Sequence, residues 1–224
     1  MNNKNSAASL TLSLFKGKQK AKILWYLQEK PLRFSELKKL LDPVSKKVFT
    51  DQLKELEKDG LIVRTVYPEV PLRVEYSLSY LGRSVQPLFN EIALWQNYYR
   101  ENYSHYIKDD RLLIDDFSGN LILEIIGDKW TPHLLRVLHL KKKRFGEIKK
   151  ELSPISQKVL TEHLRNMENY GLVKRFIYDE KPPKVEYTLT ELGISLQPIF
   201  NIMSEWGKVY EQERNKKEKE KCLD

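Results

Sequence analysis

Residues 45–67 read SKKVFTDQLKELEKDGLIVRTVY, and residues 156–178 read SQKVLTEHLRNMENYGLVKRFIY. Each segment begins with a serine, continues with apolar residues spaced along one helical face, and then reaches a glycine. A serine hydroxyl can accept hydrogen bonds from the free amides of a first helical turn, and glycine tolerates the left-handed conformation that ends many helices. After the glycine the apolar spacing changes to the alternation of a β-strand. The two segments therefore predict a helix followed at once by a strand.

The two segments are equivalent parts of a longer internal repeat. Adding 111 to a residue number takes residues 34–99 to residues 145–210 without a gap. The identical pairs include Gly60/Gly171, Tyr76/Tyr187 and Trp95/Trp206. A repeat of this length is a folding unit used twice. We therefore expect two domains, residues 1–108 and 109–224.

The remaining elements of the unit can be read in both copies. They are an apolar stretch (Ala8–Phe15, Gly119–Ile126), a helix (Ala21–Gln28, Pro132–Leu140), a short helix opened by Phe34 or Phe145 and broken by Pro43 or Pro154, a hairpin with a proline-bearing tip (Pro68–Arg73, Asp179–Lys184), and a closing helix (Gly82–Tyr99, Gly193–Tyr210). Three helices followed by a hairpin form a winged helix-turn-helix, whose third helix fits a DNA major groove. The predicted fold is mainly α with small β-hairpin wings, arranged as two tandem winged helix-turn-helix domains.

Composition narrows the function without deciding it. The net charge of +8 and a pI of about 9.3 agree with a polyanionic partner, but they also agree with simple solubility. The only cysteine, Cys222, allows no disulfide within the chain, and we expect it to be incidental. The N-terminal residues lack a signal-peptide pattern, and no apolar run reaches membrane-spanning length. We expect a cytoplasmic protein without a membrane partner.

The third helices carry the candidate DNA-binding residues. Off the apolar stripe lie Lys46, Lys47, Thr50 and Lys54 in the first copy, and Gln157, Lys158, Thr161, His163 and Arg165 in the second. Lysine and arginine can meet a phosphate, and threonine can meet a phosphate or a base edge. A merely solvated helix face is the alternative. Because Gln157, His163 and Arg165 have no identical partners in the first copy, the two helices should prefer different half-sites.

The wings and the aromatic residues offer fewer functional candidates. Arg73, Lys181 and Lys184 are candidate phosphate or minor-groove contacts, although a solvated loop would have the same composition. Trp95 and Trp206 lie on apolar stripes and should be buried. We expect Arg64/Arg175 and Glu75/Glu186 to pair across each hairpin, as architecture.

Several motifs of the second copy resemble the HxlR-type, MarR-related transcriptional regulators. These motifs are Gly127-Asp128-Lys129-Trp130-Thr131, Arg144-Phe145, Leu160-Thr161-x-x-Leu164, Gly171-Leu172-Val173 and Val185-Glu186-Tyr187-x-Leu189-Thr190. Members of that family are typically single winged-helix domains that form two-fold dimers through their first and last helices. The resemblance therefore implies a fused, tandem version of such a regulator.

The chain departs from the family pattern at two places. Gln19 stands where the second copy has Trp130. Many members place a sensing cysteine in the first helix, whereas residues 115–120 here read DDFSGN. The resemblance therefore does not imply thiol sensing.

We expect a sequence-specific double-stranded DNA-binding regulator, in which the two units act as a pseudo-dimer within one chain on an imperfect palindrome. A replication initiator with two winged helices and a protein-interaction module are the alternatives. The four histidines show no metal spacing, and there is no phosphate loop or nucleophile motif, so we expect neither catalysis nor a cofactor. A small-molecule effector and a homodimer of the tandem chain are left open.

Overall fold

The computed structural model describes residues 11, 19–41, 43–106, 121–127, 130–139, 141–181 and 183–220. Most of the predicted Ala8–Phe15 stretch, Gly119 and Asn120, and Cys222 lie outside these residues. The described part contains two copies of a mainly helical unit, each with a small antiparallel sheet. The predicted fold class, two tandem winged helix-turn-helix units, is confirmed.

The elements follow the same order in both repeats. Repeat 1 contains α2 (Gln19–Tyr26), β1 (Leu32–Arg33), α3 (Phe34–Leu40), α4 (Lys46–Lys58), β2 (Ile62–Tyr67), β3 (Arg73–Leu78), α5 (Tyr80–Arg83), α6 (Gln86–Tyr103) and the 3-10 turn η2 (Ser104–Tyr106). Repeat 2 contains α7 (Leu121–Ile126), α8 (Thr131–Leu138), β4 (Lys143–Arg144), α9 (Phe145–Glu151), α10 (Gln157–Asn169), β5 (Val173–Tyr178), β6 (Lys184–Leu189), α11 (Glu191–Ile194) and α12 (Gln197–Glu220).

The third helices begin and end as their sequences predict. The hydroxyl of Ser45 accepts from the amide of Val48, and Ser156 does the same for Val159. At the other end Gly60 and Gly171 have φ of 75° and 73°, which is the left-handed region that glycine enters at little cost. Both ends of α4 and α10 are therefore fixed by local chemistry.

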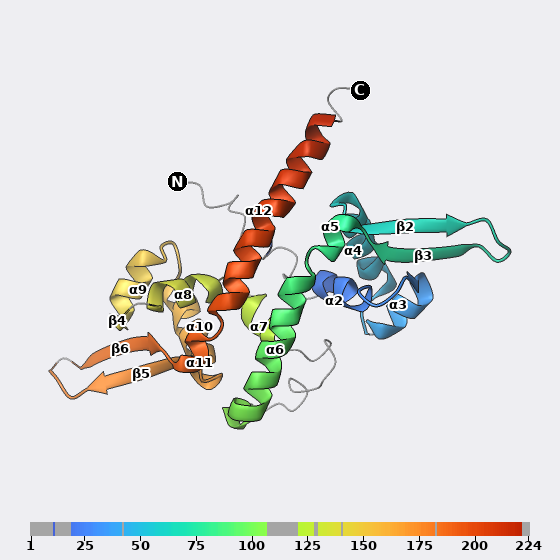
Figure 1. Cartoon of the computed structure of the whole chain (residues 1–224). Helices are drawn as coiled ribbons and strands as arrows, with labels where there is room; N and C mark the ends of the chain where they lie inside the picture. Colours follow the sequence, from blue (N-terminus) through green and yellow to red (C-terminus); the bar gives the residue numbers. More distant parts are fainter. Residues whose placement is uncertain are drawn as a thin grey trace. The chain divides into compact units, whose positions relative to one another are not determined.

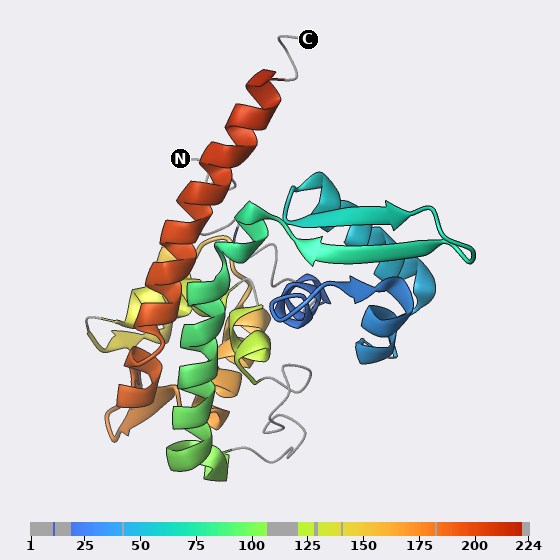
Figure 2. The same ribbon diagram turned by 45° about the vertical axis from the view of Figure 1, so that its right-hand side comes forward.

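Each sheet has a third strand that the sequence pattern did not reveal. In repeat 1 the order is β1-β3-β2, with Leu32 opposite Tyr76, and repeat 2 repeats it as β4-β6-β5. The two long strands form the expected hairpin, whose loop end projects past α3 and α4 in Figure 1. Figure 2 shows the same hairpin from another side. Because β1 and β4 contain only two residues each, alternation could not identify them.

The closing helix differs from the prediction of a single helix that starts at Gly82. The structure has a short helix, α5 or α11, and then a separate long helix that begins at Gln86 or Gln197. Proline at the second position of each long helix explains the break. A proline ring clashes with the carbonyl four residues earlier, so the long helix starts anew, with proline tolerated in its first turn.

The compact units of the structure are not the sequence repeats. One unit, here called unit 1, combines the described residues up to Ile92 with those from Asn201 onward. Unit 2 combines the described residues from Ala93 to Tyr106 with those from Leu121 to Phe200. Each unit therefore contains the winged helix of one repeat and the later part of the closing helix of the other.

In each unit a hydrogen bond joins the closing helix of one repeat, here called the exchanged helix, to the other repeat. In unit 2 the indole of Trp95 donates to the hydroxyl of Ser195 at 2.8 Å. In unit 1 the indole of Trp206 donates to the hydroxyl of Ser84 at 2.9 Å. Both tryptophans are buried, as predicted. Since a buried indole N–H needs an acceptor, these bonds help to hold each closing helix in the unit that it completes.

A second matched pair involves tyrosines one turn further along the same helices. In unit 2 the hydroxyl of Tyr99 donates to the carbonyl oxygen of Tyr170 at 3.1 Å. In unit 1, burial first and then the nearby Asp59 carboxylate raise the pKa of Tyr210 to about 12. Asp59 and Tyr170 are equivalent positions of the two repeats. The exchanged helices are therefore held in both units by the same two aromatic positions.

No helix in the described ranges is both long enough and apolar enough to cross a membrane.

Candidate nucleic-acid interface

Helices α4 and α10 are buried on one face and open on the other. Phe49, Leu53 and Leu56 of α4 are buried, and Leu160, Leu164 and Met167 are buried on α10. The wing follows each helix after a single turn, so helix and hairpin are held by the same short core. This arrangement presents one helical face and one hairpin from each repeat.

The structure brings the predicted third-helix residues together on the uncovered face of each helix. The exposed side chains are Lys46, Lys47 and Lys54 on α4, and Gln157, Lys158 and Arg165 on α10. Thr50, Thr161 and His163 are half-buried at the edge of that face. No ion pair joins any of the lysines or Arg165 to another residue in the described part of the chain. Their charges are therefore available to an external anion.

The two threonines have a more restricted chemistry than the sequence suggests. The Thr50 hydroxyl donates to the carbonyl oxygen of Lys46, and the Thr161 hydroxyl donates to that of Gln157, both at 2.8 Å. Serine and threonine often form this bond inside helices. With the proton engaged, each side chain offers a methyl group and an acceptor oxygen. Both suit a base edge, such as the thymine methyl group, better than a phosphate.

The sequence predicts that the wing cations Arg73 and Lys184 lie in the hairpin loops. In the structure they are the first residues of β3 and β6. Arg73 lies 3.4 Å from a carboxylate oxygen of Glu69 and 3.4 Å from one of Glu75, with its guanidinium 3.9 Å from the centre of the Tyr67 ring. Only 28% of the Arg73 side chain is exposed. Much of its charge is already compensated within the hairpin.

Lys184 repeats this arrangement in the second wing. Its ammonium lies 2.9 Å from a carboxylate oxygen of Glu186 and over the ring of Tyr178. The hydrogen bond to Glu186 raises the pKa of Lys184, and the same bond lowers the pKa of Glu186. Lys181, in contrast, is exposed at the tip and has no ion-pair partner among the residues that the structure describes. Of the three predicted wing cations, Lys181 is the most accessible.

The expected pairing of Arg64 with Glu75 across the hairpin is wrong. The partner of Arg64 in the register is Tyr76, and Thr65 faces Glu75. Since neighbouring residues of a strand point to opposite faces, Arg64 and Glu75 lie on different faces of the hairpin. Glu75 pairs with Arg73 and lies 3.9 Å from Arg33 instead.

Arg64 and its equivalent Arg175 thereby become candidate DNA contacts, although the sequence predicted that they have an architectural role. Both are exposed on the first strand of a wing, and neither forms an ion pair with another described residue. Their identity in both repeats was visible in the sequence, but their availability depends on the register of the hairpin. Val48 is a further addition: it is 45% exposed on α4, within the basic face.

These features define a class of protein. Two winged helix-turn-helix units, each with a basic uncovered face on its third helix, characterise a DNA-binding protein of the winged-helix type. The family described as HxlR-like helix-turn-helix matches residues 14–104 and again residues 125–215. The chain belongs to this family, which confirms the predicted resemblance.

The most similar relatives include two named as helix-turn-helix-type transcriptional regulators. YdeP of Bacillus subtilis (strain 168) is 44% identical over 107 residues, which are 46% of this chain and 84% of the relative. A regulator of Methanothermobacter thermautotrophicus is 43% identical over 110 residues, which are 48% of this chain and 83% of the relative. Less than half of this chain therefore spans most of each relative, as expected for a tandem chain. Neither relative is named as a replication initiator, and that alternative has no support here.

Solved structures give the same kind of match. A transcriptional regulator of the MarR family from Enterococcus faecalis V583 is 41% identical, with a TM-score of 0.40, over 44% of this chain and 90% of that one. The helix-turn-helix-type regulator ytcD is 42% identical, with a TM-score of 0.39, over 41% of this chain and 93% of that one.

Proposed function

We propose that this protein is a sequence-specific double-stranded DNA-binding transcriptional regulator whose two units act as a pseudo-dimer within one chain. The observation that carries the proposal is the uncovered basic face repeated on α4 and α10, each beside a wing. Its members in the two repeats include Lys47 and Lys158, which are equivalent, exposed and unpaired within the described residues. Phosphate contacts from such lysines would fix the register of each helix on DNA.

The composition of the compact units supports the pseudo-dimer. Each winged helix is completed by the closing helix of the other repeat, through Trp95–Ser195 in unit 2 and Trp206–Ser84 in unit 1. An arrangement in which each half completes the other is the intrachain counterpart of a two-fold dimer. We therefore propose a bipartite site, with half-site centres about 34 Å apart, or one DNA turn.

The two half-sites should differ in sequence. Gln157, His163 and Arg165 of α10 correspond to Lys46, Gln52 and Lys54 of α4. Lysine and arginine recognise guanine through its acceptors, whereas glutamine suits adenine. Equal backbone contacts and unequal base contacts predict an imperfect palindrome.

The candidate contacts can be ranked by their charge environment. We propose that Lys47, Lys158 and Lys181 contact phosphate, together with Arg64 and Arg175, whereas Lys46, Lys54 and Arg165 contact base edges. Arg73 and Lys184 should contribute less, because each would have to leave a glutamate partner to engage DNA. A charge already paired adds little to binding unless its partner is displaced.

We propose that the protein has no catalytic activity and no cofactor, and that it acts in the cytoplasm. Its relatives are regulators, and the described residues contain no cluster of three or more His, Cys, Asp or Glu suited to a metal ion. Activity in a broad hydrolase screen would contradict the proposal. A protein-interaction role, in contrast, predicts partner binding that does not weaken as salt is raised.

Selection of bound duplexes from a random DNA pool tests the proposal directly. We expect two unequal half-sites at the spacing of one DNA turn, bound by a single chain in sedimentation. In fluorescence anisotropy, Lys158→Ala should weaken binding and reduce the slope of log K against log salt by about one unit. Lys208→Ala removes the same charge from α12 and should leave the slope unchanged. If no sequence is enriched from the pool, or if only a dimer of chains binds DNA, the proposed pseudo-dimer is contradicted.

A further inference from the structure

Unit 2 contains a cavity beside the third helix that the proposed DNA contacts do not use. Its volume is about 220 Å³, and its described lining comes from α7, α8, α10 and the turn after α10. The lining residues are Glu124, Ile125, Thr131, His163, Asn166, Met167, Tyr170 and Leu172. An apolar cavity of roughly 150 Å³ holds benzene, so this one has room for a single-ring or short-chain molecule.

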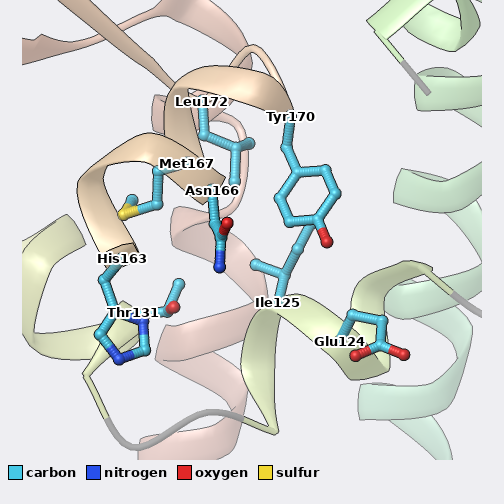
Figure 3. Close-up of a pocket in the computed structure, with 8 residues that line it drawn as sticks. All are labelled: Glu124, Ile125, Thr131, His163, Asn166, Met167, Tyr170 and Leu172. Carbon is cyan, nitrogen blue, oxygen red and sulfur yellow. The ribbon is translucent and has the colours of Figure 1, made fainter. Parts of the chain in front are cut away.

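The lining has an apolar floor and a polar rim. Ile125, Met167 and Leu172 are buried and supply the apolar surface. Figure 3 shows Tyr170 and Glu124 on one side of the view and His163 and Thr131 on the other, with Asn166 between them. Burial and the nearby Glu124 carboxylate both raise the pKa of the Tyr170 phenol. The polar rim carries one negative charge, on the carboxylate of Glu124.

The equivalent place in unit 1 is filled by the protein itself. Lys20 occupies the position of Thr131, and its ammonium lies 2.9 Å from a carboxylate oxygen of Glu55 and 3.7 Å from one of Asp59. Only 13% of the Lys20 side chain is exposed. Glu55 and Asp59 are the counterparts of Asn166 and Tyr170. Unit 1 therefore holds an ammonium group between α2 and α4, where unit 2 has a cavity between α8 and α10.

We propose that the cavity of unit 2 binds a small organic ammonium ion, a primary amine that carries a single ring or a short apolar chain. The ammonium group would meet the Glu124 carboxylate and the Tyr170 oxygen, much as Lys20 meets its two carboxylates. The apolar part would cover Met167 and Leu172. In the sequence, Ser13 stands at the position equivalent to Glu124, so the two repeats place their carboxylates on different helices.

Occupancy of the cavity should change how α10 meets DNA, a consequence that rests on the proposed function. His163 and Asn166 line the cavity from α10, and His163 borders the face proposed to read bases. A ligand that binds one orientation of these side chains better than another shifts the DNA affinity by its differential affinity. The cavity would thus make one of the two half-sites responsive to a metabolite.

Calorimetry with benzylammonium chloride tests the site without DNA. We expect one benzylammonium per chain and at least tenfold weaker binding of benzyl alcohol, which has the same shape but no charge. Glu124→Gln should lower the affinity about tenfold. Glu180→Gln removes the same charge from the wing tip, outside the cavity lining, and should leave the affinity within twofold.

Thr131→Lys places the residue of unit 1 in unit 2 and should abolish the binding of benzylammonium, with the melting temperature checked in parallel. Because Glu124 is exposed, its glutamine variant should fold normally and keeps the test valid if the lysine variant does not. Equal binding of amine and alcohol, absence of binding, or an unchanged affinity in Glu124→Gln would each overturn the proposed site.

The link to DNA is measured separately, with a selected duplex and saturating benzylammonium. We expect the DNA dissociation constant to change by at least about fivefold in the parent chain and not at all in Glu124→Gln. An unchanged constant in the parent chain would refute the coupling but leave the amine site standing. A chain that binds the amine but no DNA would refute the proposed function instead.

Discussion

Exchange of the closing helices makes a quantitative prediction about residues 100 positions apart. The Trp95 indole donates to the Ser195 hydroxyl at 2.8 Å, and that hydroxyl donates in turn to the carbonyl oxygen of Leu192 at 2.7 Å. Trp95→Phe removes the indole donor, and Ser195→Ala removes its acceptor. If both groups act through their mutual bond, the double variant should be more stable than the sum of the single effects implies.

The expected coupling follows from the geometry and burial of the bond. Trp95 is 4% exposed, so its N–H has little access to water when Ser195 is removed. A hydrogen bond of this kind contributes about 1 kcal/mol, within a range of 0.5–1.5 kcal/mol. We therefore expect a coupling free energy near 1 kcal/mol from urea unfolding followed by circular dichroism. The slope of the unfolding free energy with urea should stay constant across the cycle.

The internal repeat supplies the control, because Ser84 is the counterpart of Ser195. A second cycle between Trp206 and Ser84 should give the same coupling, since that bond is 2.9 Å long in unit 1. A cross cycle between Trp95 and Ser84 should give none beyond about 0.3 kcal/mol, the scatter expected for independent sites. Pairing of like repeats between two chains would instead couple Trp95 to Ser84. That result, or no coupling between Trp95 and Ser195, would refute the exchange.

Three further outcomes can be measured on the same chain. Gly193→Ala should destabilise the fold by about 3 kcal/mol or more in urea unfolding, because the added methyl group would overlap the backbone carbonyl of Leu172. Gly146 has open space around it, so Gly146→Ala should be neutral or stabilising by up to about 1 kcal/mol. Equal effects of the two variants would contradict the packing around Gly193. The pKa of Tyr210 is raised to about 12, so the stability that this shift contributes is complete below the unfolded pKa of about 10 and is lost as pH rises through 12. The Tyr210→Phe variant should therefore lose less stability than the parent chain between about pH 9 and 11.5. Parallel losses of stability in the two chains would contradict the pKa shift. Arg175→Ala should reduce the salt slope of DNA binding by about one unit and Lys184→Ala by clearly less, as anisotropy titrations at several salt concentrations can show; the reverse order would contradict the ranking.

Local chemistry made much of the fold predictable. The third helices begin at Ser45 and Ser156 and stop at glycines with positive φ because caps act within a few residues of the chain. The two-residue strands β1 and β4 could not be predicted in the same way. They exist only because their partners, β3 and β6, lie beside them in space. Pairing between distant segments leaves no periodic signal in so short a stretch.

The helix exchange shows a second limit of sequence reasoning. The apolar stripe that contains Trp95 predicts burial, but it does not identify the covering surface. Because the repeats are so alike, Ser84 and Ser195 are chemically equal acceptors for either tryptophan. Only the path of the chain in three dimensions decides between them. The sequence therefore predicts that these residues are buried without predicting which unit they complete.

Candidate site residues divide along the same line. The exposed lysines of α4 and α10 could be identified from helical period, because a period determines which residues share a face. The wing cations could not be ranked, because their charge environment depends on hairpin register. Arg64, which is exposed, faces Tyr76, and Tyr76 lies three residues along β3 from Arg73, which is held by Glu69 and Glu75. Composition records the charges of a loop, but the register determines which of them are available.

The two repeats share the contacts through which they complete each other, but they differ beside the third helix. Trp95/Trp206 and Ser84/Ser195 keep the same bonds in both units. The contacts beside α4 and α10 are different in the two units. Lys20 fills in unit 1 the place where Thr131 leaves a cavity in unit 2. Identical chains in a two-fold dimer would have to change both copies of such a site together. A tandem chain can instead keep one unit closed and adapt the other, so a single half-site can respond to a ligand while its neighbour holds the DNA.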